Sequence, residues 1–113
     1  MIVMKFGGTS LESAAAIERL AAIVRTRIER RPVVVVSAMG KTTNRLLEIA
    51  RSAVGGRGKE AVQQIHELHD FHLREARQVV SAADRAGLDL LLDEHFQELT
   101  ELVKGLVVLG EAT

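Results

Sequence analysis

Four consecutive valines, Val33 to Val36, directly follow Pro32 and constrain the fold more than any other part of this sequence. β-Branched residues favour strands, and an apolar run without polar alternation is typical of a strand that is covered on both faces. A second apolar segment, Ile2–Phe6, ends at two glycines and predicts another buried strand. Buried strands of this kind are typical of α/β proteins, so we expect both segments in one sheet.

A helix is expected between these two strands, which predicts a strand–helix–strand unit with parallel strands. Thr9 with Glu12 three residues later is a capping-box pattern, so the helix is predicted to start near Thr9. Arg30-Arg31 before Pro32 predicts its end, because cations suit a helix C-terminus and proline cannot continue a helix. The predicted core face has helical spacing and comprises Ile17, Leu20, Ala21, Val24 and Ile28.

The sequence after the valine run predicts further helices. One is expected to begin near Thr42, with an apolar side formed by Leu46, Leu47, Ala50 and Val54. Gly55–Gly58 predicts a break, and the pattern from Lys59 onward is helical with an interruption near Ala86-Gly87. The longest apolar stripe comprises Leu88, Leu91, Leu92, Phe96, Leu99, Val103 and Leu106.

The strands are few for an independent domain, because an isolated two-stranded sheet is marginally stable in water. Leu106–Leu109 is a possible third strand. The valine strand needs more neighbours than this, so we expect residues 1–113 to be the first part of a larger domain. The predicted class is α/β, with parallel strands and a large helical portion.

The composition excludes several classes of function. Fifteen Lys and Arg balance fifteen Asp and Glu, whereas a bulk nucleic-acid or acidic-membrane binder needs a net basic surface. No apolar run approaches the roughly 20 residues of a membrane span. The 113 residues include no cysteine, which excludes disulfides and thiol chemistry and fits a cytoplasmic protein. We therefore expect neither nucleic acid nor a membrane as a partner.

The first candidate site is the junction after the first strand, Lys5-Phe6-Gly7-Gly8-Thr9-Ser10. Phosphate binding requires backbone N–H groups that approach oxygen closely, and two glycines leave the main chain uncovered. Lys5 adds a full positive charge, while Thr9 and Ser10 add hydroxyl donors. The following helix N-terminus is expected to add partial positive charge. A tight turn with a capped helix is an equally good interpretation of these residues alone.

The second candidate site is Ser37-Ala38-Met39-Gly40-Lys41-Thr42-Thr43-Asn44, which again follows a strand. Ligands of doubly wound sheets bind beyond the carboxyl ends of the strands, where both turns are expected. The segment is not a Walker A loop, because that motif needs glycine five positions before Gly40 and position 35 is valine. The chain also contains no G-x-G-x-x-G dinucleotide fingerprint.

Together the strings KFGGTS and VVVVSAMGKTTN resemble the start of the aspartate kinases, within the amino acid kinase family. The resemblance extends over essentially the whole chain and implies part of a three-layer α/β/α sandwich. It implies an enzyme that uses ATP and Mg²⁺ to phosphorylate the β-carboxylate of L-aspartate, on the route to lysine, threonine and methionine. A cytoplasmic homo-oligomer is expected.

The resemblance also implies roles for single residues. Lys5 would be the catalytic cation, the substrate would contact Thr43 and Asn44, and no metal ligand is assigned. The residues expected to bind the ATP phosphates are Lys5, Gly7, Gly8, Thr9, Ser10 and Ser37. Glu111 precedes the position expected for the family's substrate-binding acid and is not assigned. That acid, a catalytic Asp, the adenine-binding loops and the regulatory ACT domains are expected beyond Thr113, so residues 1–113 alone should be inactive.

Two alternatives remain open. The chain resembles other amino acid kinases, such as those acting on glutamate or carbamate, less well than it resembles the aspartate kinases. The alternative from a different functional class is a non-catalytic module that assembles through the helices after Gly58. A fusion of the parent enzyme to homoserine dehydrogenase is neither indicated nor excluded.

Three histidines, His66, His69 and His72, recur at every third residue of one predicted helix. The outer two diverge by about 120° around the helix, so the three cannot converge on one ion. We predict surface or core-edge histidines.

Overall fold

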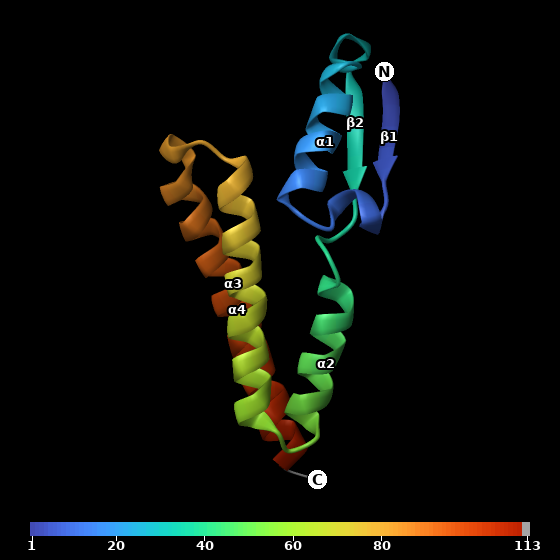
Figure 1. Ribbon diagram of the computed structural model, residues 1–113. Helices are drawn as coiled ribbons and strands as arrows, with labels where there is room; N and C mark the ends of the chain where they lie inside the picture. Colours follow the sequence, from blue (N-terminus) through green and yellow to red (C-terminus); the bar gives the residue numbers. More distant parts are fainter. Residues whose placement is uncertain (112–113) are drawn as a thin grey trace. The chain divides into compact units, whose positions relative to one another are not determined.

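The computed structural model describes residues 1–111, and the chain divides into two compact units, residues 1–41 and 42–113 (Figure 1). The first unit contains β1 (Ile2–Phe6), the 3₁₀ turn η1 (Gly8–Leu11), α1 (Ala14–Arg25), the 3₁₀ turn η2 (Ile28–Arg30) and β2 (Pro32–Val36). The second contains α2 (Thr42–Val54), α3 (Gly58–Val79), the 3₁₀ turn η3 (Ala82–Asp84) and α4 (Arg85–Glu111). The predicted α/β class with a large helical portion is confirmed.

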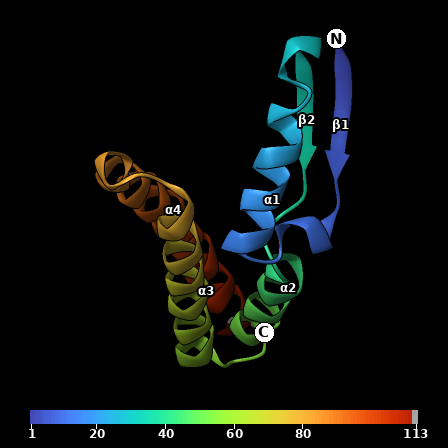
Figure 2. The same ribbon diagram turned by 45° about the horizontal axis from the view of Figure 1, so that its top comes forward.

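The two strands pair in parallel, as predicted, in a register that runs from Ile2 opposite Pro32 to Phe6 opposite Val36. Figure 2 shows α1 running alongside this pair. The expectation of a valine strand covered on both faces is wrong for the described residues, because Val33 to Val36 remain 38–53% exposed. A two-stranded sheet beside one helix has too little neighbouring structure to bury them.

Helix α1 is shorter than predicted at both ends. It begins at Ala14, and the Oγ of its N-cap Ser13 accepts a hydrogen bond from the Ala16 N–H at 3.3 Å. The Thr9–Glu12 capping box is therefore wrong, because both residues precede the helix. At the other end Thr26 caps the helix, and its hydroxyl donates to the carbonyl of Ile23 at 2.6 Å. The chain then turns at Arg31, whose φ of 54° ends η2.

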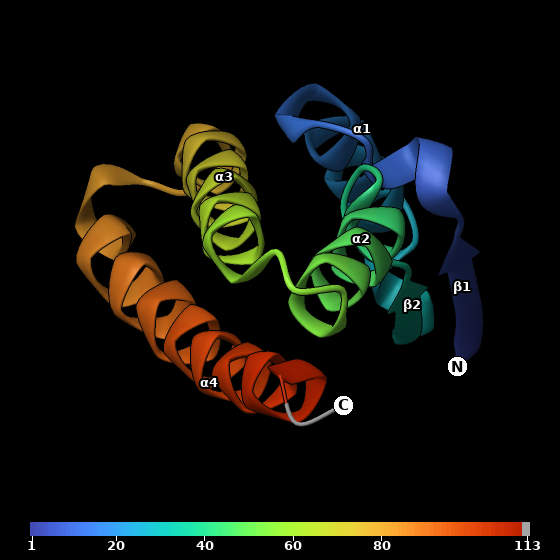
Figure 3. The ribbon, with the colours of Figure 1, turned by 90° about the horizontal axis from the view of Figure 1, so that it is seen from below.

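The second unit has its own apolar core, to which α2, α3 and α4 all contribute (Figure 3). The buried residues are Ile49, Ala53, Ala61, Ile65, Leu68 and Val103. The predicted apolar side of α2 is wrong, because Leu46, Leu47 and Val54 are exposed. The helix carries apolar residues on more than one side, and its contacts with α3 and α4 bury the side that bears Ile49 and Ala53.

The predicted boundaries of the last two helices need two corrections. The interruption lies at residues 80–84, and Gly87 lies inside α4. Leu106–Leu109 is helical and does not form a strand. The predicted stripe is otherwise largely confirmed, since Val103 is buried and only Leu91 among its members is exposed. No described helix is long and apolar enough to cross a membrane.

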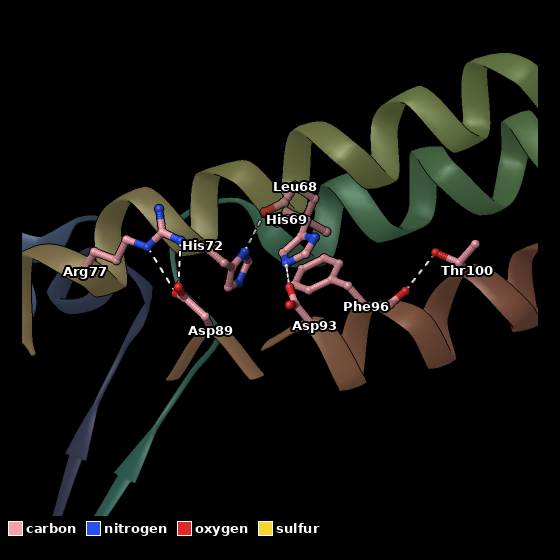
Figure 4. Close-up of polar contacts among 8 residues, drawn as sticks. All are labelled: Leu68, His69, His72, Arg77, Asp89, Asp93, Phe96 and Thr100. Carbon is pink, nitrogen blue, oxygen red and sulfur yellow. Dashed lines mark hydrogen bonds and ion pairs between the residues drawn. The ribbon is translucent and has the colours of Figure 1, made fainter. Parts of the chain in front are cut away.

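Polar contacts join α3 to α4 along one edge of their interface (Figure 4). Nε and Nη2 of Arg77 donate to the two carboxylate oxygens of Asp89 at 3.1 and 2.8 Å. This hydrogen-bonded pair lowers the pKa of Asp89 and raises that of Arg77. The ring of His69 stacks on Phe96 with a centroid distance of 4.5 Å, and its Nε2 lies 3.0 Å from Asp93 Oδ1 without the alignment of a good hydrogen bond.

The predicted placement of the histidines is confirmed. His66 is exposed, while His69 and His72 are half-buried at the edge of the core. Nδ1 of His72 lies 2.9 Å from the carbonyl oxygen of Leu68. These contacts belong to the packing of α3 against α4.

Candidate functional site

The turns that follow β1 and β2 meet at one edge of the sheet. Because Phe6 is opposite Val36, both strands end at the same level. A Cβ placed on Gly8 would lie 3.9 Å from Oγ of Ser37, so the two turns are in near contact. The N–H of Gly40 donates to the carbonyl of Leu11 at 3.1 Å and ties the second turn to the end of η1. The predicted coincidence of the two turns is thus present within the first unit.

Neither glycine of the first turn is required by the conformation of the backbone. The described residues with positive φ are Arg31, Gly40 and Gly56, so Gly7 and Gly8 are not among them. Space does not require glycine either, since a Cβ on Gly7 would meet no atom within 4 Å. Close approach of the backbone to a ligand is another reason for which proteins use glycine.

The backbone conformation explains why position 40, in the second turn, is glycine. Its φ is 60°, in the left-handed region where residues with a Cβ are strained. It also donates the hydrogen bond to Leu11 described above. Gly40 is therefore a structural residue of the site.

Lys5 lies in β1 with its side chain exposed. Successive side chains of a strand point to opposite faces, so Lys5 shares a face with Val3 and its register partner Val35, opposite to Phe6. This position places a cation one residue before the final residue of the strand. It is compatible with charge neutralisation at the strand end.

Thr9 and Ser10 lie on the side of the turn that faces α1. With Phe6 they line a cavity of ≈ 250 Å³ against residues of that helix, and Lys5 does not line it. The N–H of Ser10 donates to the carbonyl of Gly7 at 3.1 Å and closes the turn. The structure thus brings Gly8 and Ser37 together, while Thr9 and Ser10 line a cavity that Lys5 does not line.

The expected contribution of a helix N-terminus to this turn is wrong. Residues Gly8–Leu11 form one short 3₁₀ turn, and the first turn of α1 begins only at Ala14 with Ser13 as its cap. Partial positive charge near a helix end falls off within one turn. The open backbone of Gly7-Gly8 and the charge of Lys5 therefore carry the phosphate-binding interpretation.

Thr43 and Asn44, the predicted substrate contacts, lie in the first turn of α2 with exposed side chains. They belong to the second unit. Their assignment as substrate contacts stays a prediction.

The two turns suit phosphate oxygens better than they suit a bare metal ion. Residues 5–10 and 37–41 contain no carboxylate, and Mg²⁺ prefers carboxylate, phosphate and water oxygens. Within residues 1–111, no group of three or more His, Asp or Glu side chains is arranged to hold a metal. Glu111, at the last described position of α4, lines a different cavity with Gly58 and Lys104.

Sequence reasoning missed a second cluster of charged residues between α2 and α3. Arg45 and Glu48 of α2 face a cavity together with Asp70 and Arg74 of α3. Spacings of three and four residues on a helix normally indicate a solvated, charged face. Only the packing of the two helices shows that these faces meet.

Comparison with known proteins gives a consistent result over nearly the whole chain. Residues 1–107 match the model of the amino acid kinase family. The chain is 36% identical to aspartokinase 2, chloroplastic, of Arabidopsis thaliana over 98% of its own length and 20% of that protein. It is 37% identical to an aspartokinase of Chlamydia trachomatis over 89% of its length and 22% of that protein.

A maize protein named bifunctional aspartokinase/homoserine dehydrogenase 1, chloroplastic, is 29% identical over 98% of the chain and 12% of its own length. The chain thus spans about a fifth or less of the length of these relatives.

Proposed function

The chain belongs to the amino acid kinase family, and from that premise we propose that residues 1–113 are the N-terminal part of an aspartate kinase catalytic domain. In this proposal ATP phosphorylates the β-carboxylate of L-aspartate. The names of the relatives support aspartate as the substrate class. Residues 1–113 alone are inactive, because they carry only the first part of such an enzyme.

One observation carries the phosphate-binding part of the proposal. Gly7 and Gly8 are glycines that the described structure needs neither for φ nor for space, and they lie at the carboxyl edge of a parallel strand pair, with Gly8 beside Ser37. This is the edge at which α/β proteins bind ligands. The alternative interpretation of these residues, a tight turn with a capped helix, describes the observed turn closed by Ser10 and the cap at Ser13 but does not explain why positions 7 and 8 are both glycine.

The proposed chemistry follows from these groups. An oxygen of the aspartate β-carboxylate attacks the γ-phosphorus of ATP, the bond from that phosphorus to the β,γ-bridging oxygen breaks, and ADP leaves with the electron pair. Catalysis of phosphoryl transfer is mostly positioning and charge stabilisation. Lys5 provides positive charge, the N–H groups of Gly7 and Gly8 are open to phosphate oxygens, and the hydroxyls of Thr9, Ser10 and Ser37 are donors.

Mg²⁺ would accompany ATP and screen its phosphate charge when bound. Because the two turns offer hydroxyl oxygens but no carboxylate, its other ligands would be phosphate oxygens, water and groups outside these turns. Thr43 and Asn44 would orient the aspartate through their hydroxyl and amide groups.

Isothermal titration of MgATP into the 113-residue chain tests the nucleotide site. We expect saturable binding that Lys5→Ala weakens at least about tenfold, since a cation–phosphate contact is lost. Gly7→Ala and Gly8→Ala should weaken binding similarly, because an added methyl group covers the backbone that phosphate must approach. The same two variants should change the free energy of unfolding by only about 0.5 kcal/mol, as at other open surface positions.

Retention of full MgATP affinity in both glycine variants would show that these glycines serve the turn alone and would contradict the proposed site. Titration of L-aspartate against L-glutamate, with Thr43→Val and Asn44→Ala as variants, tests the substrate class in the same way. Equal binding of both amino acids would favour another member of the family.

The finer biological context is also part of the proposal. The product, an acyl phosphate of aspartate, fits a role in lysine, threonine and methionine synthesis, and we place the protein in the cytoplasm. ATP and L-aspartate are the proposed small-molecule partners.

Self-association is a second candidate property, favoured by one observation. Several large apolar side chains of α4 are exposed, namely Leu90, Leu91, Leu102, Val108 and Leu109. Exposed apolar surface of this extent favours association with a partner. Size-exclusion chromatography with light scattering should show a dimer or larger species, and a monomer at all concentrations would remove the assembly module from consideration.

A further inference from the structure

A cavity of ≈ 440 Å³ lies between α2 and α3, wholly within the second unit and separate from the glycine turns. Its floor includes Leu68, which is almost fully buried, and Phe71. Charged side chains of both signs surround this apolar floor. The cavity is large enough for a small metabolite, and ligand sites typically combine an apolar lining with a few polar groups.

Two arginines converge on one aromatic ring in this cavity. The Cζ atoms of Arg45 and Arg74 lie 4.9 and 5.8 Å from the centroid of the Phe71 ring. Neither guanidinium has a carboxylate oxygen within 4.0 Å among residues 1–111. Both guanidiniums lie over the ring, and the fork of N–H donors that each one presents suits the binding of a carboxylate.

Acceptors line the same cavity. Glu48 comes from α2, and Glu67 and Asp70 come from α3. The Oε1 atom of Gln64 is buried and has no hydrogen-bond partner among the described residues. An unpaired buried acceptor costs free energy, so a ligand that donates a hydrogen bond to it would stabilise the site.

We propose that this cavity binds a free α-amino acid as its zwitterion. The carboxylate of the ligand pairs with Arg45 and Arg74, and its ammonium group donates to the acidic residues and to Gln64 Oε1. A simple anion would be repelled by three carboxylates, and a simple cation by two guanidiniums. The side chain of the ligand lies against Phe71 and Leu68, so an apolar amino acid is preferred.

Three probes of similar length separate these possibilities: L-norleucine, hexanoate and hexylamine. Each probe is titrated into the 113-residue chain at neutral pH. Isothermal titration calorimetry measures the affinity, and backbone amide chemical shifts locate the residues that respond. L-Norleucine should bind saturably, with shifts concentrated in α2 and α3. Hexanoate and hexylamine, which each carry one of the two charges, should bind at least about tenfold more weakly.

Arg74→Gln should weaken L-norleucine binding at least about tenfold, and Asp70→Asn should also weaken it. Arg51→Gln is the matched control, since Arg51 is an exposed arginine of α2 that does not line the cavity. Arg74→Lys keeps the charge but loses the planar fork, so it tests the role of Arg74 if the glutamine variant does not fold.

Binding of hexanoate as tight as that of L-norleucine would overturn the proposal in favour of a simple anion site. Unchanged L-norleucine affinity in folded Arg74→Gln or Arg74→Lys would overturn it as well. No MgATP is present and no residue of the glycine turns is altered, so these outcomes are independent of the nucleotide site.

Discussion

Three glycines near one sheet edge illustrate how a single residue type serves different purposes. Gly40 is glycine because its φ is positive, and its N–H holds the second turn against Leu11. Gly7 and Gly8 have no such conformational reason. A sequence shows all of them as turn residues, and only the backbone angles and the neighbouring atoms separate the glycine that the turn requires from the two that it does not.

Gly40→Ala should therefore destabilise the protein by about 1 kcal/mol, because a residue with a Cβ is strained in the left-handed region. Gly7→Ala is the matched control and should be nearly neutral. Urea denaturation followed by circular dichroism measures both changes. Equal stabilities of the two variants would show that the turn relaxes without cost.

Asp89 gives a pH dependence with a definite sign. Its hydrogen bond and ion pair with Arg77 lower the pKa of Asp89 from the ordinary value of 3.8, while Arg77, whose pKa is raised, stays charged. A carboxyl group with a lowered folded pKa stabilises the protein fully above 3.8 and loses that contribution as pH falls through the lowered value.

Wild type should consequently be more stable than Asp89→Asn at pH 7, and the difference should shrink as the pH falls below 3.8. Thermal unfolding of both proteins along a pH series measures this. A stability difference between the two proteins that stays constant down to about pH 2 would show that the ion pair does not contribute. The exposure of the pair limits the size of the effect, because solvent screens surface ion pairs.

Helices α2 and α4 approach each other closely near their C-terminal ends. A Cβ on Gly110 of α4 would lie 2.7 Å from the carbonyl oxygen of Val54 in α2, which is too close for any side chain. Gly105 lies in the same helix, and a Cβ there would meet nothing within 4 Å. Close packing thus requires glycine at one of these positions only.

Gly110→Ala should destabilise the protein by about 1–3 kcal/mol, the usual cost of overpacking. Gly105→Ala should stabilise it by up to about 1 kcal/mol, because alanine is the better helix former. Chemical denaturation of the two variants gives the comparison. We expect the two variants to change the free energy of unfolding in opposite directions. Destabilisation by Gly105→Ala would point to a contact of Gly105 with a group outside residues 1–111.

The chain as a whole contains one well-packed unit and one poorly covered unit. The buried apolar residues of the first are Leu11, Ala14 and Ala16, whereas the second buries six apolar residues contributed by α2, α3 and α4. Burial of apolar surface is the main source of stability. The two units should therefore differ in their resistance to local opening.

Hydrogen exchange measures this difference residue by residue. We expect the core-facing amides of α2, α3 and α4 to exchange at least about tenfold more slowly than those of β1 and β2, since regions with few buried contacts open more readily. Equal protection in β1 and in the middle of α3 would show that the sheet is covered by a partner, such as a second copy of the chain.

Local chemistry in the sequence was sufficient to predict the two strands, their parallel pairing and the existence of each helix. A β-branched run, a strand–helix–strand order and glycine breaks act over a few residues and need no distant partner. The same locality explains the accurate placement of two turns at one sheet edge. The phosphate-site residues could be proposed from sequence for this reason.

The tertiary structure decided what local patterns leave ambiguous. The pattern at Thr9 predicted too early a helix start, and the 3₁₀ turn Gly8–Leu11 followed by the cap at Ser13 places the start of α1 at Ala14. Helix α2 carries apolar residues on more than one side, and packing selected the side with Ile49 and Ala53. The meeting of Arg45 with Arg74 over Phe71 has no sequence signal, because their proximity arises from contact between two helices.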